Sequence, residues 1–288
     1  MLKIAWHQNY KHQLPEGHRF PMAKYELLPQ QLLYEGSLQE NNFFAPSTLP
    51  ETDILATHTK DYWEKLKNLA LSPSEIRKTG FPLSNDLVER EITIAQGTID
   101  CAVFATHHAF TDRGEGFCLL NDVAIAANYL LKHQLAQKIL IVDLDVHQGN
   151  GTAEIFRNNS QVFTFSMHGE KNYPLHKEKS DLDIPLPDGI EDAAYLKILY
   201  ENLPKLIDTH KPEHIFYISG VDILKNDKLG RLGVSLQGCK QRDRFVLESA
   251  HKNSIPITVS MGGGYSEKLA DIIEAHSNTF RLAQEIYF

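Results

Sequence analysis

The sequence predicts a single α/β domain with a parallel central sheet and helices on both faces. Four short apolar runs have the composition of buried strands, at residues 139–146, 162–167, 214–219 and 257–261. Segments with helical spacing at 192–209 and 238–252 lie between the later runs, and strands separated by helices of this length indicate a parallel sheet. No internal repeat, low-complexity tract or Pro/Ser-rich linker marks a boundary, so residues 1–288 are expected to form one domain.

Further elements are predicted from apolar spacing and capping residues. Residues 2–6 resemble a short first strand. Helices are expected at 22–35, 60–69, 85–104, 121–131, 192–209, 238–252 and 267–285, with Asn85 or Asp86 as the cap of the third. Residues 107–118 are polar and contain glycines, which predicts a loop, and 169–191 is the longest segment expected to be irregular.

Composition excludes several classes of function. The chain has 29 Lys+Arg against 37 Asp+Glu, a formal charge of -8, and no run of five or more basic residues, so direct nucleic-acid binding is not expected. No stretch approaches the ~18 apolar residues of a membrane helix, and the N-terminus lacks the apolar run of a signal peptide, so an intracellular, cytoplasmic protein is expected. The three cysteines, Cys101, Cys118 and Cys239, fit neither a disulfide framework nor a cysteine-ligated zinc.

The first buried run ends in three side chains that can bind a metal. Asp143, Asp145 and His147 alternate, so on a continuing strand they would share one face. Ligands bind at the carboxyl ends of strands in open α/β sheets. Asp145 and His147, together with Asp222 after the third run, would give zinc three ligands and leave a position for water. Asp143 is expected to orient a catalytic group instead of binding zinc.

Two other motifs could supply the remaining chemistry. His107 and His108 lie in the glycine-containing loop, where neighbouring histidines can also be plain surface residues. A zinc-water mechanism needs a base and an acid, and this pair would fit if Asp143 oriented one ring and Asn150 the other. Which of the two histidines would act as the base and which as the acid stays open. Tyr265 follows three glycines and could donate a hydrogen bond to a substrate carbonyl.

Four motifs, in this order and spacing, resemble the zinc-dependent histone deacetylase family of the arginase/deacetylase superfamily. They are HHAFTDRGEGFCLLND, VDLDVHQGNG, SGVDILKNDKLGRL and SMGGGYS. The resemblance implies an arginase-like fold with a central sheet of about eight parallel strands and a narrow tunnel that leads to zinc. It assigns zinc binding to Asp145, His147 and Asp222, catalysis to His107 and His108, and carbonyl polarisation to Tyr265.

The same resemblance implies two further sites. The tunnel walls would include Gly116, Phe117, Tyr173 and Gly263. A structural potassium ion would be bound around Asp143, Asp145, His147, Ser166 and Met167, through backbone carbonyls and the Ser166 hydroxyl.

Three positions depart from the common family pattern. Gln148 and Asn150 replace a histidine and an aspartate, and this form resembles the class IV branch and its bacterial relatives. Asn150 cannot carry charge, so it should stabilise an imidazolium less than aspartate would. Lys60 stands where class I members have a rim aspartate that binds the substrate backbone, so peptides are expected to be held differently.

The expected activity is zinc-dependent hydrolysis of acylated lysine side chains in peptides or proteins. Two alternatives stay open, namely hydrolysis of a small acylated amine such as an acetylpolyamine, and weakly catalytic or non-catalytic binding of acylated ligands. A two-metal ureohydrolase is disfavoured, because these motifs supply too few ligands. The sequence leaves open whether the metal is zinc or Fe²⁺, and it predicts neither acyl length nor oligomeric state.

Overall fold

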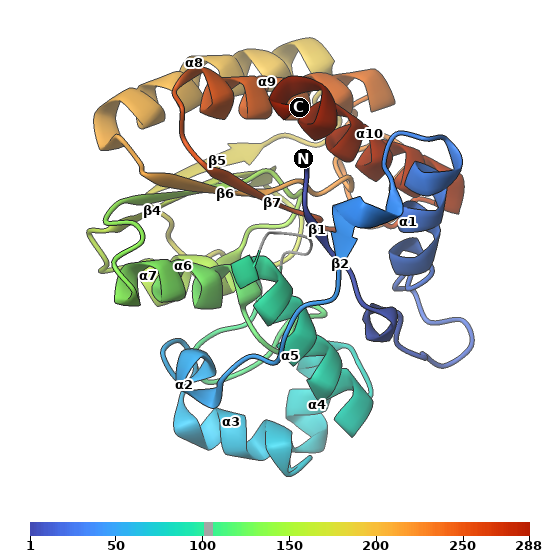
Figure 1. Ribbon diagram of the computed structural model, residues 1–288, viewed down its shortest axis with the longest axis vertical. Helices are drawn as coiled ribbons and strands as arrows, with labels where there is room; N and C mark the ends of the chain where they lie inside the picture. Colours follow the sequence, from blue (N-terminus) through green and yellow to red (C-terminus); the bar gives the residue numbers. More distant parts are fainter. Residues whose placement is uncertain (101–105) are drawn as a thin grey trace.

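The computed structural model describes residues 1–100 and 106–288, and within them a five-stranded parallel sheet forms the centre (Figure 1). The strand order is β5-β4-β3-β6-β7. The strands are β3 (Ile139–Asp143), β4 (Val162–Gly169), β5 (Leu182–Leu186), β6 (His214–Ile218) and β7 (Ile257–Ser260). The predicted α/β class is confirmed, and the four apolar runs coincide with β3, β4, β6 and β7.

Helices cover both faces of this sheet (Figure 1). One layer contains α8 (Asp192–His210), α9 (Leu236–Lys252) and α10 (Leu269–Tyr287), and the other contains α6 (Asp122–Lys132) and α7 (Asn150–Phe156). All five residues of β3 are buried. Leu140 and Val142 belong to the core cluster of α8 and α9, whereas Ile139 and Ile141 belong to that of α6. The unbroken apolar run of β3 therefore reflects burial on both faces.

The N-terminal segments form a third cluster of packed side chains beside the sheet. They comprise β1 (Ile4–Ala5), α1 (Lys24–Tyr34), β2 (Phe43–Phe44), α2 (Glu51–Ile54), α3 (Lys60–Lys67), α4 (Pro73–Thr79), α5 (Asn85–Asp100) and two 3-10 turns, Gln8–Tyr10 and Glu40–Asn42. Their core also takes in Phe117, Leu119 and Leu120. This packing places α4 and α5 next to the loop that carries the two histidines.

The strand count is lower than the resemblance implied. Within the described residues the central sheet has five strands instead of about eight, and β1 and β2 pair with each other as a separate two-stranded sheet. Each of these two strands is only two residues long, which limits the ladder that they can form. The segment 169–191 also contains a strand, β5, whose Pro185 is compatible with its position at the sheet edge.

Three short helices, α2, α4 and α7, were not predicted. For α4 a signal was present, because Ser72 and Glu75 form a capping box around Pro73. The cap of α5 is one residue earlier than expected, since Ser84 Oγ accepts a hydrogen bond from Leu87 N at 3.2 Å. Cys101 and the rest of the helix predicted to reach Phe104 lie outside the described residues.

The carboxyl ends of the strands meet at one edge of the sheet. Asp143 is in register with Ser166 of β4 and with Ile218 of β6, and Ile218 is in register with Ser260 of β7. Strand β3 ends at Asp143, so the strand predicted over 139–146 is too long, and Asp145 and His147 do not continue it. Those two residues lie in the turn after the strand, where Leu144 and Val146 point into the core.

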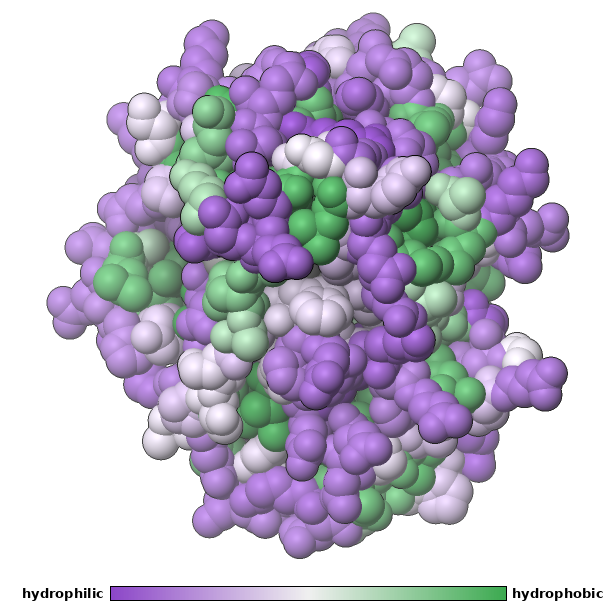
Figure 2. Space-filling model, turned by 45° about the vertical axis from the view of Figure 1, so that its right-hand side comes forward, coloured by the Kyte–Doolittle hydropathy of each residue, from purple (hydrophilic) through white to green (hydrophobic). Residues whose placement is uncertain are grey.

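Hydrophilic side chains cover most of the face seen in Figure 2, and apolar residues show there only in small groups. Within the described ranges, none of the helices combines the length and the apolar composition that crossing a membrane requires.

Candidate active site

Asp145, His147 and Asp222 form a buried cluster at this edge of the sheet. Their ligand atoms lie within 4.8 Å of one another. His147 Nδ1 is 3.1 Å from Asp145 Oδ1 and 3.1 Å from Asp222 Oδ2. The two aspartates are 1% and 0% exposed, and burial together with Asp145 raises the pKa of Asp222 to about 7. Two buried carboxylates and one imidazole are a donor set that fits a divalent cation.

Backbone amides fix the orientation of both carboxylates. Gly263 N donates to Asp145 Oδ2 at 2.6 Å, and Val146 N donates to Asp222 Oδ1 at 3.0 Å. A Cβ atom on Gly263 would lie 1.9 Å from Asp222 Oδ2, so only glycine fits there. The glycine run after β7 therefore lets the backbone approach the cluster closely.

The buried Arg242 of α9 ties together the two loops that carry these aspartates. Its Nη1 donates to Leu144 O at 3.2 Å and to Gly220 O at 2.5 Å. Leu144 precedes Asp145, and Gly220 lies two residues before Asp222. The charge of Arg242 is balanced by Asp243, whose Oδ1 is 2.7 Å from Arg242 Nη2. No motif in the sequence had indicated a role for this arginine.

The two histidines of the loop after α5 lie side by side, each held by a different partner. His107 Nδ1 is 2.7 Å from Asp143 Oδ2, and His108 Nδ1 is 2.7 Å from Asn150 Oδ1. Asn150 Nδ2 donates to Glu115 Oε2 at 3.3 Å, which directs the amide oxygen toward His108. Because an amide oxygen only accepts, Nδ1 of His108 carries the proton and Nε2 of its neutral ring has a free lone pair.

The surroundings separate the pKa values of the two rings. Burial by itself would lower the pKa of His107, but the adjacent Asp143 carboxylate raises it to about 9. Burial and the positive charge of His107 hold the pKa of His108 well below its ordinary range. At neutral pH the pair therefore contains a charged His107 and a neutral His108.

Tyr265 faces the same space from the loop after β7. Its ring centroid is 6.1 Å from that of His147. Its backbone N donates to Asp227 Oδ2 at 2.6 Å, while Asp227 Oδ1 accepts from Leu229 N and Gly230 N, both at 2.8 Å. Burial and the Asp222 carboxylate keep the pKa of the Tyr265 hydroxyl well above its ordinary value, so it stays a hydrogen-bond donor. The positioning contacts of Asp227 were not anticipated.

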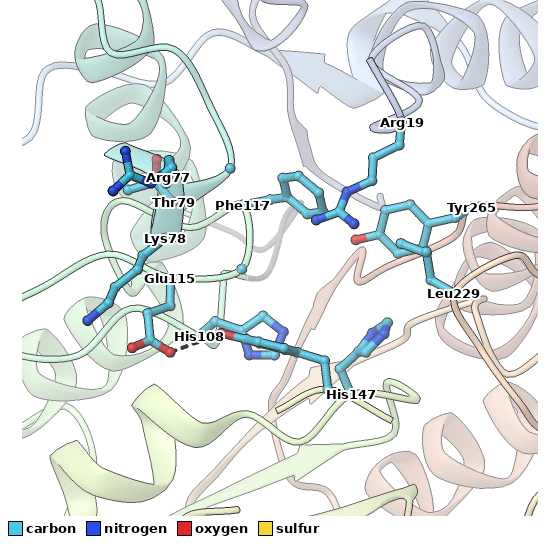
Figure 3. Close-up of a pocket in the computed structure, with 13 residues that line it drawn as sticks. Arg19, Arg77, Lys78, Thr79, His108, Glu115, Phe117, His147, Leu229 and Tyr265 are labelled. Atoms are coloured by element: carbon cyan, nitrogen blue, oxygen red, sulfur yellow. Dashed lines mark hydrogen bonds between the residues drawn. The ribbon is translucent and has the colours of Figure 1, made fainter. Parts of the chain in front are cut away.

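His108, His147 and Tyr265 face a cavity of about 470 Å³ (Figure 3). The cavity is lined by Arg19, Arg77, Lys78, Thr79, Gly80, His108, Glu115, Gly116, Phe117, His147, Tyr173, Leu229 and Tyr265. In Figure 3, His108 and His147 lie together at one end, and Phe117 and Tyr265 face each other across the space. The Tyr173 hydroxyl donates to Glu115 Oε2 at 2.9 Å. Gly116, Phe117 and Tyr173 thus line the cavity where the sequence placed a tunnel wall.

A second, smaller cavity of about 40 Å³ lies behind the first. Asp145, His147 and Tyr265 line it, and so does Gly263, which does not line the outer cavity. Lys24 reaches it from α1, and its Nζ donates to Gly262 O at 3.0 Å. Burial lowers the pKa of Lys24 to about 8. The predicted tunnel wall at Gly263 therefore belongs to this inner space.

The sequence pattern of the histone deacetylase domain matches residues 18–280. The chain belongs to the histone deacetylase family. An uncharacterized protein of Picosynechococcus sp. is 40% identical to it over 296 residues, which cover 99% of each chain. Histone deacetylase 2 of Arabidopsis thaliana is 28% identical, covering 89% of this chain and 72% of that protein. The acetoin utilization protein AcuC of Staphylococcus aureus is 27% identical, with 87% and 73% covered.

Solved structures of this family have the same fold. The HDAC homologue from Aquifex aeolicus matches with a TM-score of 0.83 at 22% identity, over 98% of this chain and 84% of that one. An HDAC homologue in complex with SAHA matches with a TM-score of 0.82 at 22% identity, over 98% and 82%. The predicted arginase/deacetylase-like fold is confirmed.

Two further predictions that came with the histone deacetylase resemblance concern Lys60 and the potassium site. Lys60 begins α3 but is not among the residues that line the cavity, whose basic residues come from other segments. Ser166 and Met167 are buried in β4, where Ser166 lies beside Asp143 and its Oγ is 2.9 Å from His168 Nδ1. The potassium site at these residues stays a prediction.

Gln148, one of the residues at which the sequence departs from the common family pattern, lines neither cavity and lies behind the site. Its Nε2 donates to Glu178 O at 2.7 Å and to Asp183 Oδ1 at 2.8 Å. These contacts hold the segment that leads into β5 against the turn after His147.

Proposed function

We propose that this histone deacetylase family member is a zinc-dependent amidohydrolase that removes acyl groups from lysine side chains. The observation that carries the proposal is that the three-residue cluster, the His pair and Tyr265 lie together at the carboxyl ends of the strands, where His108, His147 and Tyr265 line both cavities. The family assignment supports deacetylase activity in general. We further propose that Gln148 and Asn150 relate the chain to the class IV branch.

The metal would be held by Asp145, Asp222 and Nδ1 of His147. Two oxygens, one imidazole and a position left for water are a donor set that suits zinc. When bound, the metal supplies a Lewis acid that polarises the amide carbonyl and lowers the pKa of a water molecule.

The protein side chains would move the protons. Nε2 of neutral His108 accepts a proton from the attacking water, whose oxygen bonds to the amide carbon. The Tyr265 hydroxyl donates to the carbonyl oxygen as negative charge develops on it. His107 stays protonated beside Asp143, and its positive charge stabilises the negative charge that develops on the carbonyl oxygen. His108 then returns the proton to the amide nitrogen, the C–N bond breaks, and lysine amine and carboxylic acid leave.

The inner cavity favours short acyl groups. At about 40 Å³ it has room for roughly three water molecules, at 10–15 Å³ each. We propose that an acetyl methyl group enters this space and that a long fatty chain does not fit there.

A panel of lysine peptides bearing acetyl to myristoyl groups, assayed with and without a zinc chelator, tests both parts. We expect the acetyl peptide to be cleaved fastest and the chelator to abolish cleavage. Fastest cleavage of the myristoyl peptide would overturn the proposed acyl length only. No cleavage of any peptide, or cleavage indifferent to the chelator, would overturn the zinc-dependent deacylase itself.

A further inference from the structure

We propose that the mouth of the cavity selects acyl-lysine substrates that carry a carboxylate close to the modified side chain. This inference rests on the proposed deacylase function and adds a substrate class to it. Three cationic side chains, Arg19, Arg77 and Lys78, line the cavity, although the chain as a whole has a formal charge of -8. All three are exposed residues.

These cations have no carboxylate partner in the described part of the chain. None of the ion pairs found there includes Arg19, Arg77 or Lys78, so their charges are available to a ligand. A single carboxylate, Glu115, is among the residues that line the cavity, and it is already engaged. It accepts hydrogen bonds from Arg113 Nε at 3.0 Å and from the Tyr173 hydroxyl at 2.9 Å.

The cations are tied to the wall of the cavity and are not on independent loops. The guanidinium carbon of Arg19 lies 5.0 Å from the centroid of the Phe117 ring, a cation–π contact. Gly116 N donates to Lys78 O at 3.1 Å, and Phe117 N donates to Thr79 O at 2.8 Å. The end of α4 is therefore joined through its backbone to the strip of wall that contains Phe117.

Figure 3 shows the resulting arrangement around the opening. Arg77 and Lys78 lie on one side of Phe117, and Arg19 extends toward the Phe117 ring from the other side. An acyl-lysine that reaches the His pair would thus place its backbone and neighbouring groups among three positive charges. Such a mouth attracts a neighbouring carboxylate and repels neighbouring lysines or the ammonium groups of a polyamine.

Peptides that differ only in flanking charge measure this preference. One acetyl-lysine peptide would have Asp on both sides of the modified lysine, a second Lys and a third Ala. Exposed ion pairs change affinity by about two- to fivefold each, so we expect kcat/KM to favour the Asp over the Lys peptide by about tenfold in ~0.05 M salt. The ratio should shrink in ~0.5 M salt, where the screening length is about 4 Å.

Charge reversal tests which residues are responsible. In the variant Arg77→Glu/Lys78→Glu the ratio of kcat/KM for Asp to Lys peptides should fall below one. Lys138→Glu/Lys205→Glu reverses two charges away from the cavity, because Lys138 directly precedes the amino end of β3 and Lys205 lies on α8. This control variant should keep the ratio of the parent protein. If the reversed variant does not fold, Arg77→Gln/Lys78→Gln should lower the ratio toward one.

A second substrate pair identifies the source of the carboxylate, by comparing free Nε-acetyl-lysine with its carboxamide. A preference in the peptide pair points to flanking acidic residues, and a preference in the small-molecule pair points to a free carboxylate, and either supports the proposal. Equal kcat/KM in both pairs, or a preference for the Lys peptide, overturns it while leaving the deacylase function intact. Absence of hydrolysis in every arm would instead overturn the proposed function.

Discussion

Asn150 Oδ1 lies 2.7 Å from Nδ1 of His108, and Asp143 Oδ2 lies at the same distance from Nδ1 of His107. One imidazole of the pair thus has a neutral partner and its neighbour has a charged one. This difference is the basis for assigning the proton-accepting role to His108. A carboxylate beside His108 would stabilise its charged form and raise its pKa.

Replacing Asn150 by Asp therefore tests the assignment. The acidic limb of the pH profile of kcat/KM should move to higher pH, because a base must be neutral to accept a proton and would now stay protonated longer. Asn253→Asp makes the same chemical change at the exposed end of α9 and should leave the limb in place. An unmoved limb in Asn150→Asp would remove His108 from the role of base.

Tyr265→Phe should lower kcat by about 100-fold or more and leave zinc content unchanged, since only the hydrogen bond to the developing oxyanion is lost. Tyr173→Phe, which removes a hydroxyl that contacts Glu115 in the same cavity, should have a much smaller effect. The test is to measure kcat and the zinc content of both variants. Loss of zinc from Tyr265→Phe, or full activity, contradicts the assigned role.

Arg242→Met should weaken zinc binding by about 10- to 100-fold, because the loops that carry Asp145 and Asp222 lose their shared donor. It should also destabilise the protein by about 3–5 kcal/mol, since it leaves Asp243 buried without its cation. Competition with a chromophoric chelator measures the first effect and thermal unfolding the second.

The double variant Arg242→Met/Asp243→Asn separates the two effects of Arg242. It removes the unpaired charge but keeps an acceptor oxygen for one of the two hydroxyls, of Tyr217 and Thr279, that donate to Asp243. Stability should recover in part, whereas zinc affinity should stay low. If zinc affinity recovered together with stability, Arg242 would have no specific role in positioning the ligands.

The Glu35–Arg281 pair predicts a dependence of stability on pH. Two hydrogen bonds from Arg281, at 2.8 and 2.6 Å, are the main reason why the pKa of Glu35 falls from 4.5 to about 2. A carboxyl whose pKa is lower in the folded state stabilises above its unfolded value, and this contribution is lost as pH falls from about 4.5 toward 2.

Thermal unfolding of Glu35→Gln tests this dependence. At pH 7 the variant should be less stable than the parent by about 1–2 kcal/mol, and the difference should vanish near pH 2. The same change at the exposed Glu26, which pairs with Lys11, should cost less. A difference between Glu35→Gln and the parent that does not change between pH 7 and pH 2 would contradict the assignment.

The sequence predicted the part of the fold that depends on local pattern. The run that became β3 is apolar throughout because both of its faces are covered, and the polar residues that follow it mark the edge where the site forms. Strand β5 was missed because Pro185 argues against a central strand and only the edge position permits it. Helix α7 was missed because Asn150 and Gly151, its first residues, are poor helix formers.

The residues that support the site were harder to predict, because their function depends on long-range contacts. Arg242 and Asp243 resemble the surface charges of an amphipathic helix. Only the packing of α9 against the loops that carry Asp145 and Asp222 shows that they are buried. Arg77 and Lys78 resemble ordinary basic residues in the last turn of a helix. Their place at the cavity follows from backbone contacts between α4 and the segment around Phe117.

Titration of metal-free protein with zinc measures whether one zinc ion per chain is needed for hydrolysis. Initial rates of amine release from an acetyl-lysine peptide would be measured after each addition, in parallel for the parent protein and Asp222→Asn. We expect no activity without metal, a linear rise that ends at one zinc per chain, and little activity in the variant at that ratio. Full activity of the metal-free protein, or a parent that binds one zinc and stays inactive, would contradict this expectation.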